Sequence, residues 1–277
     1  MGIEIPMCHG LSLNIGDPPS GRKAYPTETL QKGFLLFDQG QELAEEAVGF
    51  GVPILKRGLQ TIFPGASTLA WLRQGTIWNV TALYKLNLVE KISDAGNNAV
   101  EKKSLYAVKN GLAALIRSLP ILRRPLTVIS NLLRRFFNWK TIYTQAGFST
   151  DLKVLYTLNT ETGRVKIEMD TSGIPSEITE VMVMNEQGAN IFDRYMDTSG
   201  IFLRGQEIGC WDEVIAREAW FESHAHRVTF RLGRVKGARL FRGRELLGSR
   251  LAWAGFGYSF SPSIQSFQYE LSIEKRP

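Results

Sequence analysis

Two of the three histidines in the chain lie close together, beside an acidic residue, in the segment ESHAHRVTF. If this segment is a strand, alternate side chains point to the same face, so Glu222, His224 and His226 share one face. The hydrophobic residues Val228 and Phe230 continue that face. We therefore expect an inward-facing polar cluster here, at the end of a row of core residues.

This cluster allows three chemical interpretations. Imidazoles two residues apart on a strand project in parallel, so His224 and His226 can bind a divalent metal if a third oxygen ligand lies nearby. Without a metal, Glu222 beside an imidazole can work as a general acid and base, with a pKa raised by apolar surroundings. In the third interpretation both histidines are partly buried side chains without a chemical role. A divalent metal is the one cofactor that the sequence suggests.

The hexapeptide MDTSGI occurs twice, at 169–174 and at 196–201. Paired aspartates that share a proton activate water in aspartic proteases, but in those enzymes glycine follows the aspartate by two positions, and here it follows by three. Strand alternation places Met169 in the core and Asp170 on the solvent-facing side, and the same orientation is expected for Asp197. Both copies are therefore predicted to be turns that end strands.

Three more acidic residues, Glu42, Glu45 and Glu46, precede the glycine-containing segment GFGVP. Acidic side chains beside a glycine turn are compatible with sugar binding or glycosidic chemistry, although their spacing pairs none of them, and a solvated face is the expected role. Sequence patterns for dinucleotide binding, the P-loop, the G-x-S-x-G elbow and the H-E-x-x-H zinc site are absent.

The elements that must position these residues are mostly β-strands. Segments rich in β-branched and aromatic residues alternate with glycine turns, and roughly ten strands are predicted. The turn NTETG is expected to join two of them, and the unit from Thr179 to Ile201 is expected to repeat that hairpin with a shorter turn. The predicted fold is mainly β, a large antiparallel β-sandwich or partly closed β-barrel, in a single domain over residues 1–277.

Residues 94–140 have a different pattern and are predicted to form an inserted basic amphipathic helical hairpin. Residues 98–140 contain nine basic residues and one acidic residue. The apolar residues of the first helix recur at helical spacing up to Pro120, and Pro125 suits the first turn of a second helix. The second basic segment, residues 227–250, is expected to lie on solvent-facing strand positions and turns, where it could attract an anionic ligand.

The helical hairpin has three possible partners. It can pack on the β core with its basic residues in water, or it can bind an anionic membrane surface, or it can bind another polyanion. The membrane interaction would use Arg123, Arg124, Arg134 and Arg135. No nucleic-acid-binding module is recognisable, so a nucleic-acid partner is not expected.

Composition limits the remaining possibilities. The chain has 277 residues, of which 44% are hydrophobic and 22% charged, as in folded proteins. Without a secretory signal or an apolar run long enough to span a bilayer, we expect a cytoplasmic location, extended to a peripheral membrane one if the hairpin binds lipid.

The expected function is that of an enzyme or binding protein. It would act on a small-molecule or glycan substrate in the mouth of the β core, through Glu222, His224 and His226. The alternative is a non-enzymatic lipid- or membrane-binding protein that works through the helical hairpin.

Overall fold

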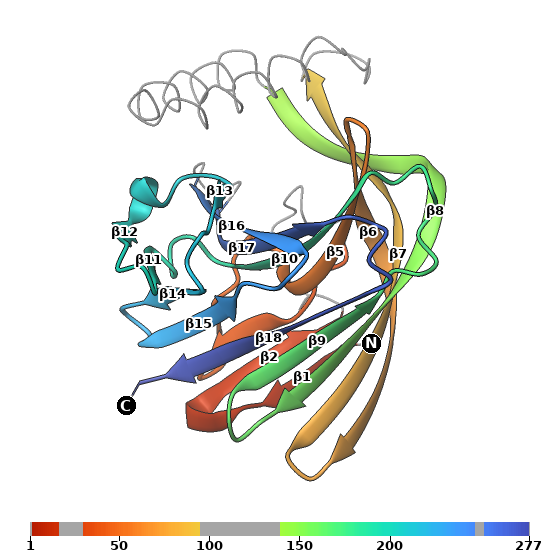
Figure 1. Cartoon of the computed structure of the whole chain (residues 1–277). Helices are drawn as coiled ribbons and strands as arrows, with labels where there is room; N and C mark the ends of the chain where they lie inside the picture. The colour runs from red at the N-terminus through yellow and green to blue at the C-terminus, as the bar shows by residue number, and fades with distance from the viewer. Residues whose placement is uncertain (1, 17–29, 95–138, 247–251, 277) are drawn as a thin grey trace.

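The computed structural model describes residues 2–16, 30–94, 139–246 and 252–276 (Figure 1). These residues form two sheets in which every pair of neighbouring strands is antiparallel. The smaller sheet contains β1 (Ile3–Pro6), β2 (Leu11–Ile15), β3 (Leu35–Asp38) and β4 (Gln41–Glu42). The larger sheet contains, in spatial order, β12 (Phe202–Arg204), β11 (Arg194–Asp197), β14 (Glu218–Ser223), β15 (Val228–Gly233), β18 (Ser266–Lys275), β9 (Arg164–Asp170), β8 (Trp139–Asn159), β7 (Ile77–Asp94), β6 (Gln60–Gln74), β5 (Gly49–Arg57), β10 (Glu180–Gln187), β17 (Ala252–Phe260), β16 (Ala238–Leu246) and β13 (Asp212–Glu213).

The larger sheet curves back on itself, so that two of its parts pack face to face as a β-sandwich (Figure 1). Aromatic side chains fill the space between these parts. The ring of Phe230 on β15 lies 5.2 Å from that of Phe50 on β5 and 5.9 Å from that of Phe256 on β17. Tyr258 on β17 lies 5.3 Å from Phe267 on β18. Strand alternation thus gives β5 and β17 one face that belongs to the sandwich core.

Three long strands, β6, β7 and β8, connect the two parts of the sandwich. The pairing of all three strands is irregular at neighbouring positions. The register shifts at Pro64 on β6, at Asn87 on β7 and between Gln145 and Thr150 on β8. Extra residues of this kind bend strands and increase their twist. The bend lets one continuous ladder take part in both layers.

A buried hydrogen-bond network crosses the core between these layers. The hydroxyl of Tyr156 on β8 donates to the carbonyl of Gly51 on β5 at 2.9 Å and bonds the hydroxyl of Tyr84 on β7 at 2.8 Å. Asn185 on β10 accepts from the N–H of Gly51 at 3.1 Å and from the hydroxyl of Tyr269 on β18 at 2.8 Å. Gly51 has a φ of 78°, and a Cβ there would lie 2.5 Å from the Tyr156 ring, so only glycine fits.

The prediction of a helical hairpin over residues 94–140, inserted in the β fold, is contradicted by the structure. β7 continues to Asp94 and β8 begins at Trp139, and these two residues pair with each other, so both ends of the range are strand. Their backbone groups bond across the ladder, which excludes the helical hydrogen-bond pattern. The described residues contain only two short 3₁₀ helices, Cys8–Gly10 and Gly205–Ile208, and among them no helix has the length and hydrophobicity needed to cross a membrane. Residues 95–138 lie outside the described residues, and Arg123, Arg124, Arg134 and Arg135 are among them.

Local predictions of strands are confirmed, but one predicted hairpin is wrong. β8 and β9 pair across the NTETG turn as expected, with Asn159 opposite Arg164. The unit from Thr179 to Ile201 does not repeat this plan, because β10 pairs with β5 and β17, whereas β11 pairs with β12 and β14. The two strands lie in different parts of the large sheet because long-range pairing, and not the local pattern, decides their neighbours.

Tyr156→Phe should lower the free energy of unfolding by about 1–3 kcal/mol, because it leaves the Gly51 carbonyl and the Tyr84 hydroxyl buried without their partner. Urea denaturation measures this difference. Leu59→Ala, at the exposed turn between β5 and β6, is the control and should stay within about 0.5 kcal/mol of the parent. Equal stability of Tyr156→Phe and the parent would contradict the role of the network.

Candidate functional site

The predicted cluster of Glu222, His224 and His226 lies at the hairpin between β14 and β15, not along one strand. β14 ends at Ser223 and β15 begins at Val228, so both histidines are in the turn. Glu222 is buried, His224 is exposed and His226 is half-buried. The alternation that would place all three on one face therefore stops at the end of β14.

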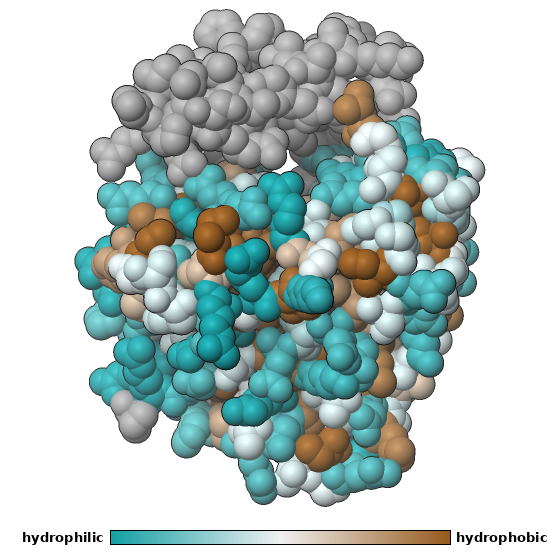
Figure 2. All heavy atoms as spheres, viewed as in Figure 1, coloured by the Kyte–Doolittle hydropathy of each residue, from teal (hydrophilic) through white to brown (hydrophobic). Residues whose placement is uncertain are grey.

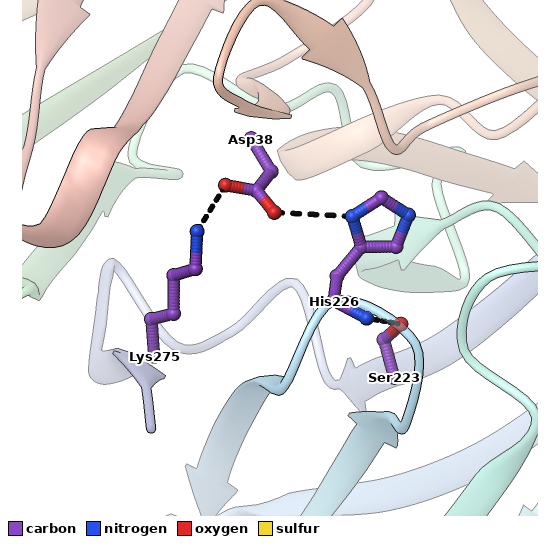
Figure 3. Close-up of polar contacts among 4 residues, drawn as sticks. All are labelled: Asp38, Ser223, His226 and Lys275. Atoms are coloured by element: carbon purple, nitrogen blue, oxygen red, sulfur yellow. Dashed lines mark hydrogen bonds and ion pairs between the residues drawn. The ribbon is translucent and has the colours of Figure 1, made fainter. Parts of the chain in front are cut away.

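His226 joins an ionic network with residues from two other parts of the chain (Figure 3). Its ring Nδ1 lies 3.1 Å from Oδ2 of Asp38, the last residue of β3. The other oxygen of Asp38 accepts from the ammonium group of Lys275, the last residue of β18. The backbone N–H of His226 donates to the Ser223 hydroxyl at 3.3 Å, which holds the turn in place. The network ties the small sheet to β18 and to the turn between β14 and β15 of the large sheet.

Two opposing influences set the pKa of Asp38. Burial acts to raise it, but the hydrogen bonds and positive charges of Lys275 and His226 outweigh burial, so the pKa of Asp38 lies below its usual value of 3.8. The carboxylate is therefore ionised at neutral pH. Its partners are also mostly buried, with side chains 15% and 16% exposed, so solvent screens these contacts less than it would at the surface.

Glu222 takes part in a different contact. Its Oε1 lies 3.2 Å from a guanidinium nitrogen of Arg276, whose backbone N–H also bonds the carbonyl of Arg227 at 2.9 Å. Nowhere in the described ranges do three or more His, Cys, Asp or Glu side chains come together as a metal site would need. The catalytic role of Glu222, His224 and His226, and the metal-binding role of the two histidines, stay predictions.

Both MDTSGI copies form the predicted turn. Asp170 accepts the backbone N–H of Ser172 at 3.0 Å, and Asp197 accepts that of Ser199 at 2.9 Å. Asp170 is exposed as predicted, but the prediction for Asp197 is wrong, since it is 5% exposed and accepts from the Tyr195 hydroxyl at 2.7 Å. The reason is that Tyr195, two residues before it, is the core residue of β11.

The acidic residues before GFGVP are not all solvated. Glu46 is 6% exposed, contrary to the expectation, while Glu42 and Glu45 are half-buried. Glu45 accepts the backbone N–H and the side-chain amide of Asn190 at 3.0 and 2.8 Å. Glu45 therefore connects the segment before β5 to the segment after β10.

A second candidate site lies on the face of β5, β10 and β17 that points away from the sandwich core. Along β10, Val183 and Asn185 point into the core, so Met184 and Glu186 point to the opposite side. We call this surface the Glu186 face; in Figure 1 it is the side of β10 and β17 turned away from β15 and β18. Its apolar part is a second hydrophobic cluster of Leu30, Val48, Val52, Ile54, Leu88 and Met184, with Phe63, Tyr143, Met182 and Trp211 packed against it.

Among the described residues of this face, Glu186 is the one acidic residue whose pKa is strongly altered. It is buried, with 5% of its surface exposed. Burial is the largest influence and raises its pKa. The backbone N–H of Val48, which bonds the carboxylate, opposes burial, the nearby Glu245 raises the pKa further and Lys32 lowers it. The balance raises the pKa of Glu186 to about 8. Glu186 is therefore mostly protonated at neutral pH and can donate its proton.

Two tryptophans stack beside Glu186. The rings of Trp211 and Trp253 lie 4.8 Å apart with planes 22° from parallel. They rest on glycines, because a Cβ at Gly243 would lie 2.7 Å from the Trp253 ring and a Cβ at Gly257 would lie 2.9 Å from the Trp211 ring. Gly255 lies between Trp253 and Gly257 on β17 and is directly opposite Glu186. The missing side chains thus let the indoles lie close to the sheet, next to the acid.

Four arginines in residues 227–246 of the second basic segment contact acidic or carbonyl groups. Arg231 lies 3.7 Å from Glu218, Arg239 lies 2.8 Å from Glu213, Arg242 lies 3.6 Å from Asp212, and Arg244 donates to the Ala189 carbonyl at 2.9 Å. Teal and brown residues alternate on the face that Figure 2 shows, without a single large hydrophobic patch. These contacts hold the four arginine side chains against neighbouring parts of the chain.

Glu186, Trp211 and Trp253 were not among the site residues that the sequence predicted. One signal was available, because the apolar run VMVM in β10 shows no alternation between apolar and polar residues. Such a run is typical of a strand buried on both faces. The polar residues that follow it, Asn185 and Glu186, therefore had to be buried on opposite sides.

No protein-family model and no curated protein sequence matches the chain. Solved structures do match it. The GalNAc complex of the alpha-N-acetylgalactosaminidase NagBb from Bifidobacterium bifidum aligns with a TM-score of 0.51 and 11% identity, over 99% of this chain and 36% of that chain. The chain thus spans little more than a third of that enzyme's length.

Two further structures align less closely. An alpha-mannosidase from Enterococcus faecalis V583 has a TM-score of 0.43 and 10% identity, over 99% of this chain and 29% of that chain. The Slr1438 protein from Synechocystis sp. PCC 6803 has a TM-score of 0.41 and 9% identity, over 100% of this chain and 96% of that chain. At these identities the likeness to NagBb is one of fold.

Asp38→Asn should lower the free energy of unfolding at neutral pH by about 1–3 kcal/mol, because it leaves the Lys275 ammonium mostly buried without its counter-charge. Since the folded pKa of Asp38 is below the unfolded value, its contribution is present above about pH 4 and is lost as pH falls through the folded pKa. Chemical denaturation at about pH 7 and about pH 2 measures both effects, with the exposed Glu161→Gln as control. A deficit that persists unchanged at about pH 2 would contradict the ionic role.

Glu186→Gln should change the pH dependence of stability in the opposite direction. Between the unfolded pKa of 4.5 and the folded pKa of about 8, the folded protein holds one more proton than the unfolded chain, so raising pH destabilises the parent. The variant should therefore gain on the parent by at most about 1.4 kcal/mol per pH unit across this window. Denaturation at a series of pH values tests this, and a constant difference from about pH 5 to about pH 8 would show that Glu186 titrates normally.

Proposed function

We propose that the chain binds a carbohydrate on the Glu186 face and that Glu186 donates its proton to an oxygen of the bound sugar. The observation that carries the proposal is a buried carboxylic acid, with its pKa raised to about 8, beside a stacked tryptophan pair. Ligand sites in proteins combine an apolar, aromatic surface with a few convergent polar groups and altered pKa values, and this face has all three.

The tryptophans account for binding. A pyranose ring has an apolar side made of C–H groups, and a large flat indole is a suitable contact surface for it. Trp211 is half-buried, whereas Trp253 is 7% exposed beneath its partner and next to Gly243. Trp211 therefore provides the contact with the sugar, and Trp253 supports it from below.

Trp211 is held in an unusual backbone conformation. Its φ of 60° lies in the left-handed region, which bulky residues rarely adopt. Strain of this kind persists where the surrounding structure fixes a side chain for a purpose. In this proposal the purpose is to place the indole against Trp253 and Gly257, near Glu186.

The acid accounts for chemistry. Departure of a sugar oxygen requires a proton donor, and a carboxylic acid provides it only if it remains protonated at the working pH. Glu186 meets this condition, and Glu245 on β16 adds a second carboxylate whose charge raises the pKa of Glu186. Two carboxyl groups with different environments are the usual equipment for glycosidic bond cleavage.

The comparison supports a sugar ligand at the level of fold. NagBb, which shares the fold, is an alpha-N-acetylgalactosaminidase and was crystallised with GalNAc. This agrees with the glycan substrate that the sequence suggested. GalNAc is therefore the first sugar to test, with galactose and mannose beside it for comparison.

Saturation-transfer NMR with these sugars measures binding. Trp211→Ala should weaken it by about twofold to tenfold, because an aromatic contact of this kind contributes about 0.5–1.5 kcal/mol and 1.4 kcal/mol is a factor of ten. Trp71→Ala, which removes an exposed tryptophan on β6, should bind as the parent does. Failure of all three sugars to bind the parent, or equal losses in both variants, would contradict the proposal.

Aryl glycosides separate catalysis from binding. Glu186→Gln should keep sugar binding but abolish turnover, because the amide has no acidic proton. His224→Ala and His226→Ala serve as the opposing pair, since loss of turnover in them, with full activity in Glu186→Gln, would favour the site that the sequence suggested. Circular dichroism shows whether each variant is folded.

A further inference from the structure

β6 has an exposed edge along most of its length. It pairs with β7 from Ile62 to Gln74, but its other side pairs with β5 only from Gln60 to Ile62. The carbonyl of Pro64 accepts the N–H of Gln31, and beyond it residues 65–74 have no strand on their outer side within the described ranges. An edge of this kind presents a row of backbone donors and acceptors to a further strand.

The bend in the long strands separates this edge from β5. The register shifts on both sides of Pro64, and a Cβ at Gly65 would lie 2.4 Å from the Asn87 amide oxygen, so β6 turns here against β7. The hairpin of β6 and β7 then extends to the lower end of the molecule in Figure 1. In the same view, Figure 2 shows some brown residues beside teal and white ones at this lower end.

The edge lacks the features that normally prevent pairing with another chain. From Ala66 to Leu72 there is no charged residue, proline or bulge. Edge strands are usually protected by one of these. Large hydrophobic side chains are exposed instead, because Trp71 is 44% exposed, Leu72 is 57% exposed and Leu83, on β7 beside Thr68, is 42% exposed.

We infer that this edge pairs with the same edge of a second copy of the chain, antiparallel, with Leu69 on the two-fold axis. In this register Trp71 lies opposite the partner's Ser67, and Leu72 lies opposite the partner's Ala66, so each large side chain meets a small one. Directly opposite residues share a face of the sheet, as the two-fold axis normal to the sheet requires. The large sheet continues from one copy into the other.

The chemistry of the edge favours a second copy over a different protein. A two-fold antiparallel pair satisfies both edges with one surface, so the contact closes and does not propagate. In a pair of identical strands, charged residues can come close to the same charges of the partner and repel them. Residues 66–72 carry no charge, so this repulsion is absent. Between Ala66 and Leu72 the edge therefore has no charge that would select an oppositely charged partner.

This inference is independent of the proposed function. The β6 edge begins beyond the bend, whereas Glu186 lies on β10 and points to a different surface. Pairing through β6 leaves the Glu186 face as it is in the single chain. Loss of pairing should therefore leave sugar binding unchanged.

The mass in solution tests the pairing. Light scattering on the parent should give twice the chain mass at micromolar concentration, and the double variant Thr68→Lys with Ala70→Lys should give the single mass. Both side chains are exposed, and in this register each lies opposite the other in the second copy, so lysines there repel across the contact. Leu59→Lys, at the exposed turn between β5 and β6, is the control and should keep the double mass. A single mass for the parent, or a double mass for the Thr68/Ala70 variant, would overturn the inference.

Cross-linking tests the register. After Cys8→Ser and Cys210→Ser remove the native thiols, Leu69→Cys should form a disulfide between two copies under mild oxidation, because residues on the axis have Cβ atoms about 4.5–5.5 Å apart. Leu59→Cys should remain uncoupled under the same conditions. Equal coupling of the two variants would show that the copies meet by chance collision and not through β6.

Discussion

The hydroxyl of Tyr156 is the contact on which the architecture depends. Inside the core it bonds Tyr84 and the carbonyl of Gly51, and through Gly51 it reaches Asn185 on the opposite layer. Buried polar groups stabilise a fold only when they have partners, so this network fixes the positions of β5, β7, β8 and β10 relative to one another. Hydrophobic packing alone would allow these strands to slide, because side chains of similar shape fill the same space.

The same constraint creates the Glu186 face. Because Asn185 is held toward the core, its neighbour Glu186 must point to the opposite side of β10. That side is also apolar, so the acid is buried without a counter-charge strong enough to keep it ionised, and its pKa rises. The glycines of β16 and β17 then admit Trp211 and Trp253 beside it. The hydrogen bonds that hold Asn185 on one face of the sheet thus also place Glu186 on the other face, where burial raises its pKa.

Sequence patterns predicted what depends on near neighbours in the chain. Alternation and glycine turns revealed most strands, such as the β8 and β9 hairpin, and the two MDTSGI turns. Strand neighbours depend on contacts far apart in the sequence, so the pairing of β10 with β5 and β17 could not be predicted. Two local differences have physical causes. The segment from Glu222 to His226 is not one strand, because the bond from the N–H of His226 to the Ser223 hydroxyl closes it as a turn. The burial of Glu186 was not predicted, because alternation assigns a strand one solvent-facing side, whereas β10 is buried on both faces.

Direct titration of Glu186 shows whether this buried acid is protonated at neutral pH. The chemical shift of its side-chain carboxyl carbon, followed by ¹³C NMR and assigned by its absence in Glu186→Gln, reports the protonation of this group alone. We predict a midpoint near pH 8, since burial in the apolar Glu186 face and the charge of Glu245 outweigh the bond from Val48 and the charge of Lys32. A midpoint near 4.5, the ordinary value of a glutamic acid, would show that the group is ionised at neutral pH and is not a proton donor.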